Sequence, residues 1–223
     1  MAQQIVKIRY ITHITHDVLE IVTDKPEGFT FTAGQAVAVS INKIGWVNEV
    51  RPFSLTSIPE QYFLEFIIKV YPLHKGVTNH LLQLKEGDEL ILHNTFGAIS
   101  YKGKGVFIAG GAGITPFISI LRDLHSRKEV DSNKLIFANK TKEDIILEAE
   151  LKAILKHNVV NIIADENVKG YAQGLISESF LKSHVSQSCK NVYLCGPPQM
   201  MEAVEGQLRQ LNIDEKSITK EEF

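Results

Sequence analysis

Residues 105–125, GVFIAGGAGITPFISILRDLH, decide how the second half of the chain folds. A short apolar run comes first, a glycine-rich turn follows, and apolar residues at helical spacing come last. Pro116 can begin the helix, because its φ is fixed and its missing N–H is not needed at the first helical position. The stretch therefore predicts a buried strand, a tight turn and a helix, which is the repeating unit of a parallel αβ sheet.

The same alternation of apolar strands and helical stretches continues toward the C-terminus. Strands are expected in KLIFANK, VVNIIAD and NVYLCG, and helices in DIILEAELKAIL and MMEAVEGQLRQL. Parallel strands need crossover helices of this kind, so residues 103–223 are expected to form one parallel αβ domain.

The first hundred residues differ, because apolar and polar residues alternate there in short runs between turns. The runs IVKIRYITH, DVLEIVT, QAVAVSI and YFLEFIIKV are typical of strands. Frequent turn residues favour a compact antiparallel β-barrel over residues 1–102, with one helix at residues 77–84 covering an end. The boundary is expected at residues 101–105, where a short Lys-Gly repeat supplies a flexible join.

The composition argues against several classes of protein. With 223 residues and 44% hydrophobic side chains, the chain can build one large or two small cores, so disorder is not expected. A formal net charge of −2 and the lack of a lysine-rich block argue against a nucleic-acid partner. Two cysteines cannot build a four-cysteine iron–sulfur site, and the histidines show no metal-ligand spacing, so no metal site is expected.

Neither the N-terminus nor any internal run predicts a membrane segment. MAQQIVKIRYITH lacks the apolar core and the cleavage site of a secretion signal, so the protein is expected to be cytoplasmic. The longest uncharged apolar run, residues 106–121, is too short for a comfortable span and is interrupted by glycines and proline. Membrane contact is therefore not expected, and the sequence does not indicate an oligomeric state.

The first of three motifs that carry chemistry is RPFSLTS at residues 51–57. On a strand, Arg51 and Phe53 share one face, while Ser54 points the other way or sits at a twist. A planar guanidinium matches a pyrophosphate, and the ring beside it can pack on an isoalloxazine. The alternative is an exposed arginine on a barrel strand next to a core phenylalanine.

A helix start at residues 75–79, KGVTN, is a candidate anion site in the same half. Free backbone N–H groups point outward at a helix N-terminus, and the Thr78 hydroxyl adds a donor. The alternative is ordinary N-capping by Thr78 or Asn79.

The second motif is the turn GGAGITP at residues 110–116. Its glycines let the backbone approach a pyrophosphate, and the N-terminus of the following helix favours negative charge. The alternative is a turn that only packs the strand on the helix.

If this turn binds a nicotinamide dinucleotide, the charged residues after the next two strands give conflicting signals about whether that dinucleotide carries a 2′-phosphate. Lys140 and Lys142, which follow the second αβ strand, could meet the 2′-phosphate of NADPH. Asp165 and Glu166, which follow the next strand, could repel that phosphate or bond ribose hydroxyls. The choice between NADH and NADPH stays open on these residues.

The third motif is YLCGPPQM at residues 193–200. Cys195 ends an apolar strand, at the edge where ligands of open αβ sheets bind. This location suits a nicotinamide contact. The alternative is a small buried cysteine before a turn.

Together and in this order, the three motifs resemble the ferredoxin reductase family of flavoenzymes, and the resemblance covers nearly the whole chain. It implies FAD in the barrel and a nicotinamide dinucleotide, NAD(P)H, in the αβ domain. Phe53 stands where the family usually has tyrosine, and Ser54 matches a serine that lies by flavin N5. The FAD contacts that the resemblance implies are Arg51, Phe53, Ser54, Lys69, Gly76, Val77 and Thr78.

In the second half, the resemblance implies a nicotinamide site whose Cys195 faces the C4 region. The terminal ring of Phe223 would cover the flavin, which makes Glu221 the proton-handling carboxylate, with Glu222 as the competing choice. The contacts to the dinucleotide would come from Gly111, Gly113, Thr115, Pro116, Asn139, Lys140, Cys195, Gly196, Pro197 and Met200.

The activity that the resemblance implies is hydride transfer from NAD(P)H to FAD, followed by transfer of single electrons to a separate carrier such as flavodoxin or ferredoxin. The reductase component of an oxygenase and a ferric or free-flavin reductase would share every residue named. A nucleotide-binding electron-transfer subunit without its own turnover is less favoured, because Ser54, Cys195 and a terminal carboxylate are all present.

Overall fold

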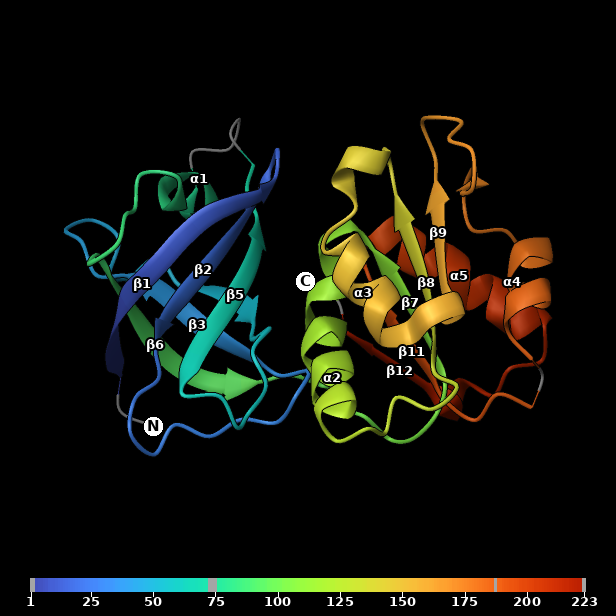
Figure 1. Cartoon of the computed structure of the whole chain (residues 1–223), viewed down its shortest axis with the longest axis horizontal. Coiled ribbons are helices and arrows are strands. Elements are labelled where there is room, and N and C mark those ends of the chain that lie inside the picture. The colour runs from blue at the N-terminus through green and yellow to red at the C-terminus, as the bar shows by residue number, and fades with distance from the viewer. Residues whose placement is uncertain (1–2, 72–75, 187, 222–223) are drawn as a thin grey trace.

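The computed structural model describes residues 3–71, 76–186 and 188–221. It contains two six-stranded sheets, one in each half of the chain. Figure 1 shows the two halves side by side, with the C-terminus between them.

The N-terminal sheet is antiparallel and has the strand order β4-β3-β6-β1-β2-β5. Its edge strands meet where Leu55 forms a bridge with Phe66, which closes the sheet into a barrel. The barrel interior is apolar, as the alternation of residue types predicts. The strands are β1 Gln4–Thr15, β2 Val18–Asp24, β3 Ala36–Ile41, β4 Arg51–Ser54, β5 Phe63–Lys69 and β6 Glu89–Phe96.

One helix, α1 Val77–Leu81, covers an end of the barrel with Val77 and Leu81 buried. The expected helix was longer, because residues 82–84 instead form turns in which each N–H bonds the carbonyl three residues earlier. The helix position is confirmed and its C-terminal boundary is wrong.

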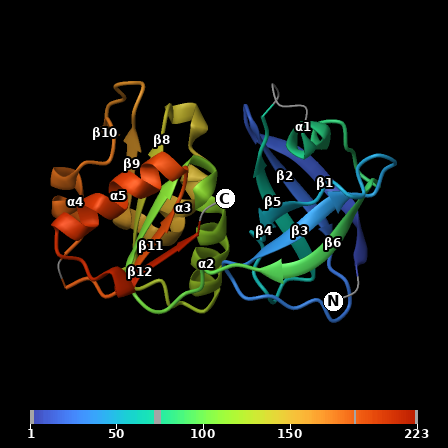
Figure 2. The same ribbon diagram turned by 180° about the vertical axis from the view of Figure 1, so that it is seen from behind.

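The C-terminal sheet is parallel and has the strand order β10-β9-β8-β7-β11-β12. Helices α2 and α3 cover one face and α4 and α5 the other, as Figures 1 and 2 show from opposite sides. Successive strand residues point to the two layers in turn, so Phe107 packs under α2 while Ile108 packs under α5. The elements are β7 Val106–Gly110, η1 Gly111–Ile114, α2 Thr115–Ser126, β8 Lys134–Asn139, η2 Lys142–Asp144, α3 Glu148–Leu155, η3 Lys156–Asn158, β9 Val159–Ile163, β10 Ala172–Gln173, α4 Glu178–His184, β11 Val192–Cys195, α5 Pro198–Gln210, η4 Glu215–Ser217 and β12 Ile218–Glu221.

The expected class, an antiparallel barrel followed by a parallel αβ domain, is confirmed, but several elements besides α1 differ from the sequence prediction. Helix α3, which follows β8, begins at Glu148 rather than at Asp144. Asp144 closes a capping box on Thr141, and Leu147 has a left-handed φ of 50°. Strands β6, β10 and β12 and helix α4 were not expected. The sequence assigned the tail a covering ring and a carboxylate but no strand, and residues 218–221 form the edge strand beside β11.

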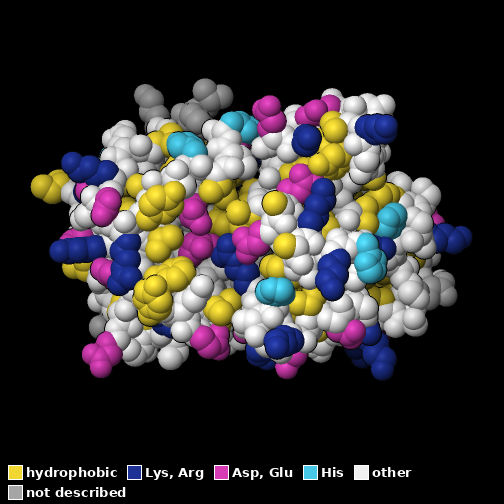
Figure 3. Space-filling view, in the orientation of Figure 1, with side chains coloured by type: hydrophobic (Ala, Val, Ile, Leu, Met, Phe, Trp, Pro, Cys, Tyr) yellow, Lys and Arg dark blue, Asp and Glu magenta, His cyan; other side chains and the backbone are white. Residues whose placement is uncertain are grey.

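The two halves share an apolar core and a buried polar network. Barrel residues such as Ile67 and Ile99 belong to the same cluster as Phe117 of α2. The Arg122 guanidinium of α2 pairs with Glu65 of β5, and its Nη2 lies 2.9 Å from Glu150 Oε2 of α3. Figure 3 shows basic and acidic side chains gathered in the middle of this face, where the halves meet.

Candidate active site

The carboxyl ends of four neighbouring strands bring the predicted nicotinamide residues together. In the sheet register Cys195 of β11 lies beside Ala109 of β7 on one side and Glu221 of β12 on the other. Asn139 ends β8, the neighbour of β7 on its other side. Residues far apart in the sequence thus meet at the edge where parallel sheets bind ligands.

Two kinds of glycine occur at this edge. A Cβ on Gly110 would clash with Met200 Sδ, and one on Gly113 would clash with the carbonyl oxygen of Cys195. Gly111 differs, because its φ is +50° and no atom lies within 4 Å of the position that its Cβ would take. The packing explanation therefore fits Gly113, whereas Gly111 presents open backbone, as a phosphate cradle requires.

The side chain of Asn139 is buried, and neither Nδ2 nor Oδ1 has a hydrogen-bonding partner among the described residues. Buried amides are almost always paired, since an unpaired one loses its bonds to water without replacement. The Nδ2 donor and the Oδ1 acceptor of this amide fit the ribose hydroxyls or the carboxamide of a dinucleotide.

Cys195 is fully buried, and burial raises the pKa of its thiol to about 12, with Glu221 adding to the shift. The side chain is therefore a neutral thiol at pH 7, which suits a packing contact to a ring and not a nucleophile.

The carboxyl group of Glu221 reaches from β12 to the barrel. Burial raises its pKa, although the backbone N–H groups of Ile99 and Ala98 act in the opposite direction. Its Oε2 is buried, has no hydrogen-bonding partner in the described part of the chain and lies 3.4 Å from where a Cβ on Gly97 would be. A carboxyl in this state holds a proton more readily than an exposed one. Glu222 and Phe223, the other tail residues of the prediction, lie outside the described residues.

The RPFS stretch forms β4, paired with β3. Arg51 is exposed and its Nη2 lies 3.3 Å from Glu49 Oε2, while Phe53 is half-buried and Ser54 is buried. An exposed ion pair of this kind contributes little stability, so the guanidinium can exchange Glu49 for a phosphate.

The start of α1 is capped by the backbone of Gly76, and no side chain caps it. The alternative explanation, capping by Thr78 or Asn79, is therefore wrong. In the next turn His80 stacks on Trp46, with 4.2 Å between ring centroids.

Lys69 is engaged at the interface between the halves. Its Nζ lies 2.7 Å from Asp17 Oδ2 and 3.6 Å from Asp144 Oδ1. Burial lowers the pKa of Lys69, but the two carboxylates outweigh it and the net shift is upward. Any contact to FAD would require this ammonium to leave Asp17. His16 joins the same group, and the ligand atoms of His16, Asp17 and Asp144 lie within 4.8 Å of one another, a cluster that the histidine spacing did not predict.

Acidic residues lie against the loop that carries Lys140 and Lys142. The Lys142 N–H donates to Glu166 Oε1 at 2.8 Å, and the Asp165 N–H donates to the carbonyl of Lys140 at 2.9 Å. The sequence placed these two groups at successive strand ends, and the structure brings them into contact.

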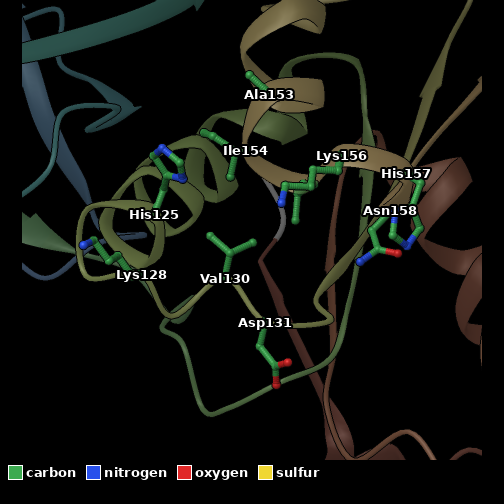
Figure 4. A pocket seen from close by; sticks show the side chains of 10 residues that line it. His125, Lys128, Val130, Asp131, Ala153, Ile154, Lys156, His157 and Asn158 are labelled. Atoms are coloured by element: carbon green, nitrogen blue, oxygen red, sulfur yellow. The ribbon is translucent and has the colours of Figure 1, made fainter.

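A cavity of about 410 Å³ lies away from these residues, between the C-terminal ends of α2 and α3. Figure 4 shows His125 and Lys128 on one side of it and Lys156 and His157 on the other. None of the predicted site residues lines it.

Two family models match the chain, and they overlap at residues 107–133. The FAD-binding domain matches residues 3–133, and the oxidoreductase NAD-binding domain matches residues 107–206. The fold and site therefore define a two-domain flavoprotein oxidoreductase that uses a nicotinamide dinucleotide. The chain belongs to the ferredoxin reductase-like family of FAD- and NAD-binding oxidoreductases, which confirms the resemblance carried by the three motifs.

Among curated relatives, NADH-cytochrome b5 reductase 2 of Mycosarcoma maydis is 28% identical over 222 residues, covering 89% of this chain and 63% of the relative. The protein of the same name from Lodderomyces elongisporus is 30% identical over 220 residues, covering 88% and 70%. The NADH nitrate reductase of Cucurbita maxima is 29% identical over 244 residues, covering 92% and 26%. The chain thus spans less than two thirds of the first relative and about a quarter of the last.

Solved structures share the fold over the whole chain. The FAD/NAD-binding domain of nitric oxide dioxygenase from Vibrio cholerae has a TM-score of 0.87 at 21% identity, covering 99% of this chain and 98% of that one. A ferredoxin NADP+ reductase from Neisseria gonorrhoeae, with bound FAD and NADP, has a TM-score of 0.85 at 21% identity, covering 100% and 99%. Among the described residues, no helix has the length and apolar character needed to cross a bilayer.

Proposed function

We propose that this chain is a reductase that takes a hydride from NADH onto FAD and passes single electrons to a haem protein of the cytochrome b5 type. The observation that carries the proposal is a pair of polar side chains, Asn139 and Glu221, on either side of the β7 and β11 strand ends. Among the described residues, no group bonds the buried amide of Asn139 or the buried Oε2 atom of the half-buried Glu221. Both side chains therefore have hydrogen-bonding capacity left for a ligand.

The barrel residues would hold the flavin. Arg51 would bind the pyrophosphate through its planar guanidinium, and Phe53 would pack on the ring system. Ser54, buried at the end of β4, would offer its hydroxyl to the ring. Gly76, Val77 and Thr78 would offer backbone and hydroxyl donors, because the N-cap residue of α1 is Gly76 and makes no side-chain capping bond. When bound, FAD supplies the chemistry of accepting a hydride and releasing electrons one at a time.

The αβ domain would hold the donor. The open backbone of Gly111 and the start of α2 at Thr115 and Pro116 would receive the pyrophosphate. Lys140 lies in the loop after Asn139, where it could meet a phosphate. Gly113, Gly196, Pro197 and Met200 would act by packing, since they interlock the turns after β7 and β11.

At the reacting end, Cys195 and Glu221 lie side by side in the sheet register. Cys195 would orient the nicotinamide by contact with a neutral thiol. Glu221 would hold a proton on the carboxyl oxygen that has no partner, because burial raises its pKa. The position of Phe223 as a lid stays a prediction.

NADH is the proposed donor because acidic side chains lie beside the loop that would face a 2′-phosphate. Glu166 bonds the backbone of Lys142, and Asp165 lies against Lys140. A carboxylate there repels a phosphate and accepts hydrogen bonds from ribose hydroxyls. The names of the relatives, which include NADH-cytochrome b5 reductase, support the same choice.

The relatives also change the expected acceptor. The sequence alone suggested flavodoxin or ferredoxin, whereas the curated relatives are named for cytochrome b5 and nitrate reduction. A haem protein is therefore the better-supported acceptor. The oxygenase-reductase and ferric or free-flavin alternatives would use the same residues and differ only in the acceptor.

The test begins with a visible spectrum of the purified chain reconstituted with FAD and mixed with NADH or NADPH. We expect NADH to bleach the flavin faster than NADPH does. Stopped-flow mixing of the reduced protein with cytochrome b5, flavodoxin or ferredoxin then compares acceptors. A protein that does not bind FAD contradicts the whole proposal, whereas faster oxidation by flavodoxin or ferredoxin contradicts only the acceptor.

A further inference from the structure

A second cavity, of about 580 Å³, lies at the amino-terminal ends of β7, β8 and β11, and its wall includes residues 102–105, which link the two halves. We call it the linker cavity. It is at the opposite edge of the sheet from Asn139 and Cys195, so it is separate from the proposed nicotinamide site. Its volume is in the range of cavities that bind small molecules.

Among the described residues that line the linker cavity there are several basic side chains and no carboxylate. The basic residues are Lys102, Lys104, Lys134, His184 and Lys190. This concentration of positive charge contrasts with the net charge of −2 of the whole chain. Lys104 pairs at 3.0 Å with Asp131, but both side chains are more than half exposed, so the pair can exchange.

The linker wall is held in place by side chains of the αβ domain. The Tyr193 hydroxyl accepts from the Lys102 N–H at 2.8 Å and donates to the carbonyl of Gly103 at 2.7 Å. Asn133 Oδ1 accepts from the Gly105 N–H at 2.9 Å. The expected flexible join is therefore a fixed wall, and a ligand would not have to order it.

Lys134 is half-buried, whereas the other three lysines of the linker cavity are exposed. Burial lowers the pKa of Lys134, and no carboxylate of the described chain lies within ion-pair distance. Within the described part of the chain, the side chain of Lys134 makes one hydrogen bond, a long one of 3.4 Å from Nζ to the carbonyl oxygen of His184. An ammonium partly withdrawn from water without a counter-charge gains from an incoming anion.

We propose that the linker cavity binds a small phosphate anion of two or more negative charges, such as a diphosphate group. Lysine ammonium groups bind phosphate as point charges. Several positive charges around one cavity therefore favour a ligand that carries more than one negative charge. The proposal is independent of the proposed reductase function, since it uses none of its residues.

Isothermal titration calorimetry with sodium pyrophosphate tests the proposal. The protein is loaded with FAD and saturated with NAD⁺, so that the proposed dinucleotide sites are filled. We expect binding to be at least about tenfold weaker in Lys134→Gln/Lys190→Gln than in the wild type. Lys102→Gln/Lys190→Gln, which changes two exposed residues, repeats the test if the first variant folds poorly.

Lys182→Gln/Lys216→Gln removes the same charge outside the cavity and is the matched control, expected to bind within about twofold of the wild type. Titration with ADP shows whether the diphosphate is recognised as part of a nucleotide or as a free ion. The proposal is overturned if pyrophosphate gives no binding at millimolar concentration. It is also overturned if the cavity variants and the control lose affinity equally.

Discussion

Neither polar atom of the buried Asn139 amide has a partner among the residues that the structure describes, which is costly for a residue that serves only the fold. The sequence identified this asparagine only from its place after an apolar strand. Its burial and its lack of partners could not be read from the sequence, because they depend on how neighbouring turns pack around it.

Replacing Asn139 with leucine separates binding from stability. The free energy of unfolding should stay unchanged or rise by about 1 kcal/mol, because an unpaired buried amide is removed. The KM for NADH should rise by about tenfold, because the donor loses its hydrogen bonds to the amide. Urea denaturation and steady-state kinetics measure the two effects, and a stability loss without a KM change would assign Asn139 to the fold.

Glu221→Gln should change how stability depends on pH. Burial raises the pKa of Glu221, so the folded protein binds this proton more tightly than the unfolded chain does. The stabilisation is fully present below the ordinary pKa of about 4.3 and is lost as pH rises through the raised value. Between about pH 4 and the raised pKa, the free energy of unfolding of the variant should therefore rise relative to that of the wild type. Above the raised pKa, the difference between the two should stay constant.

Urea denaturation at a series of pH values gives this difference directly. Glu222→Gln is the matched control in the same tail. A difference between Glu221→Gln and wild type that does not vary with pH would show that Glu221 titrates normally.

At the scale of elements, the turn between β7 and α2 combines two glycines with different requirements. Gly111→Ala places a side chain at a left-handed φ in open space, so it should cost about 1 kcal/mol and mainly weaken dinucleotide binding. Gly113→Ala would clash with the backbone of Cys195 and should cost about 3 kcal/mol.

Gly206→Ala in α5 is the control, because its Cβ has free space and alanine favours a helix, giving a gain of about 0.5 kcal/mol. Thermal denaturation of the three variants gives the order of their stabilities. Equal losses for Gly111→Ala and Gly113→Ala would contradict the distinction between cradle and packing.

Helices and strands were predictable from the sequence where the apolar pattern was long. The predicted boundary of a helix was wrong where a single side chain makes a hydrogen bond that the pattern does not reveal. The run 105–125 gave strand, turn and helix, because apolar spacing and Pro116 agree. The early start predicted for α3 failed because the side chain of Asp144 bonds back to Thr141. Strand β12 was missed because four residues, ITKE, carry too little pattern and form a strand only by pairing with β11.

At the scale of the molecule, Arg122 connects the halves through Glu65 of the barrel, and it also pairs with Glu150 of its own half. No sequence pattern joins these three residues, since the contact arises only when α2 packs on the barrel. Arg122→Met should lower the free energy of unfolding by about 3 kcal/mol, because it leaves partly buried carboxylates without a counter-charge.

Replacing both glutamates by glutamine in the Arg122→Met background should recover most of that loss, since no unpaired charge remains. Chemical denaturation of the single and triple variants makes the comparison. A triple variant no more stable than the single one would show that the charges are not the cause.

The apolar cluster that includes Ile67 and Ile99 of the barrel and Phe117 of α2 has a consequence for how the protein melts. Two halves that share one apolar core should unfold together, because neither half keeps a complete core when the other unfolds. Scanning calorimetry should give a single endotherm whose calorimetric and van't Hoff enthalpies agree. Genes cut between the two coding halves should yield fragments that aggregate when expressed alone.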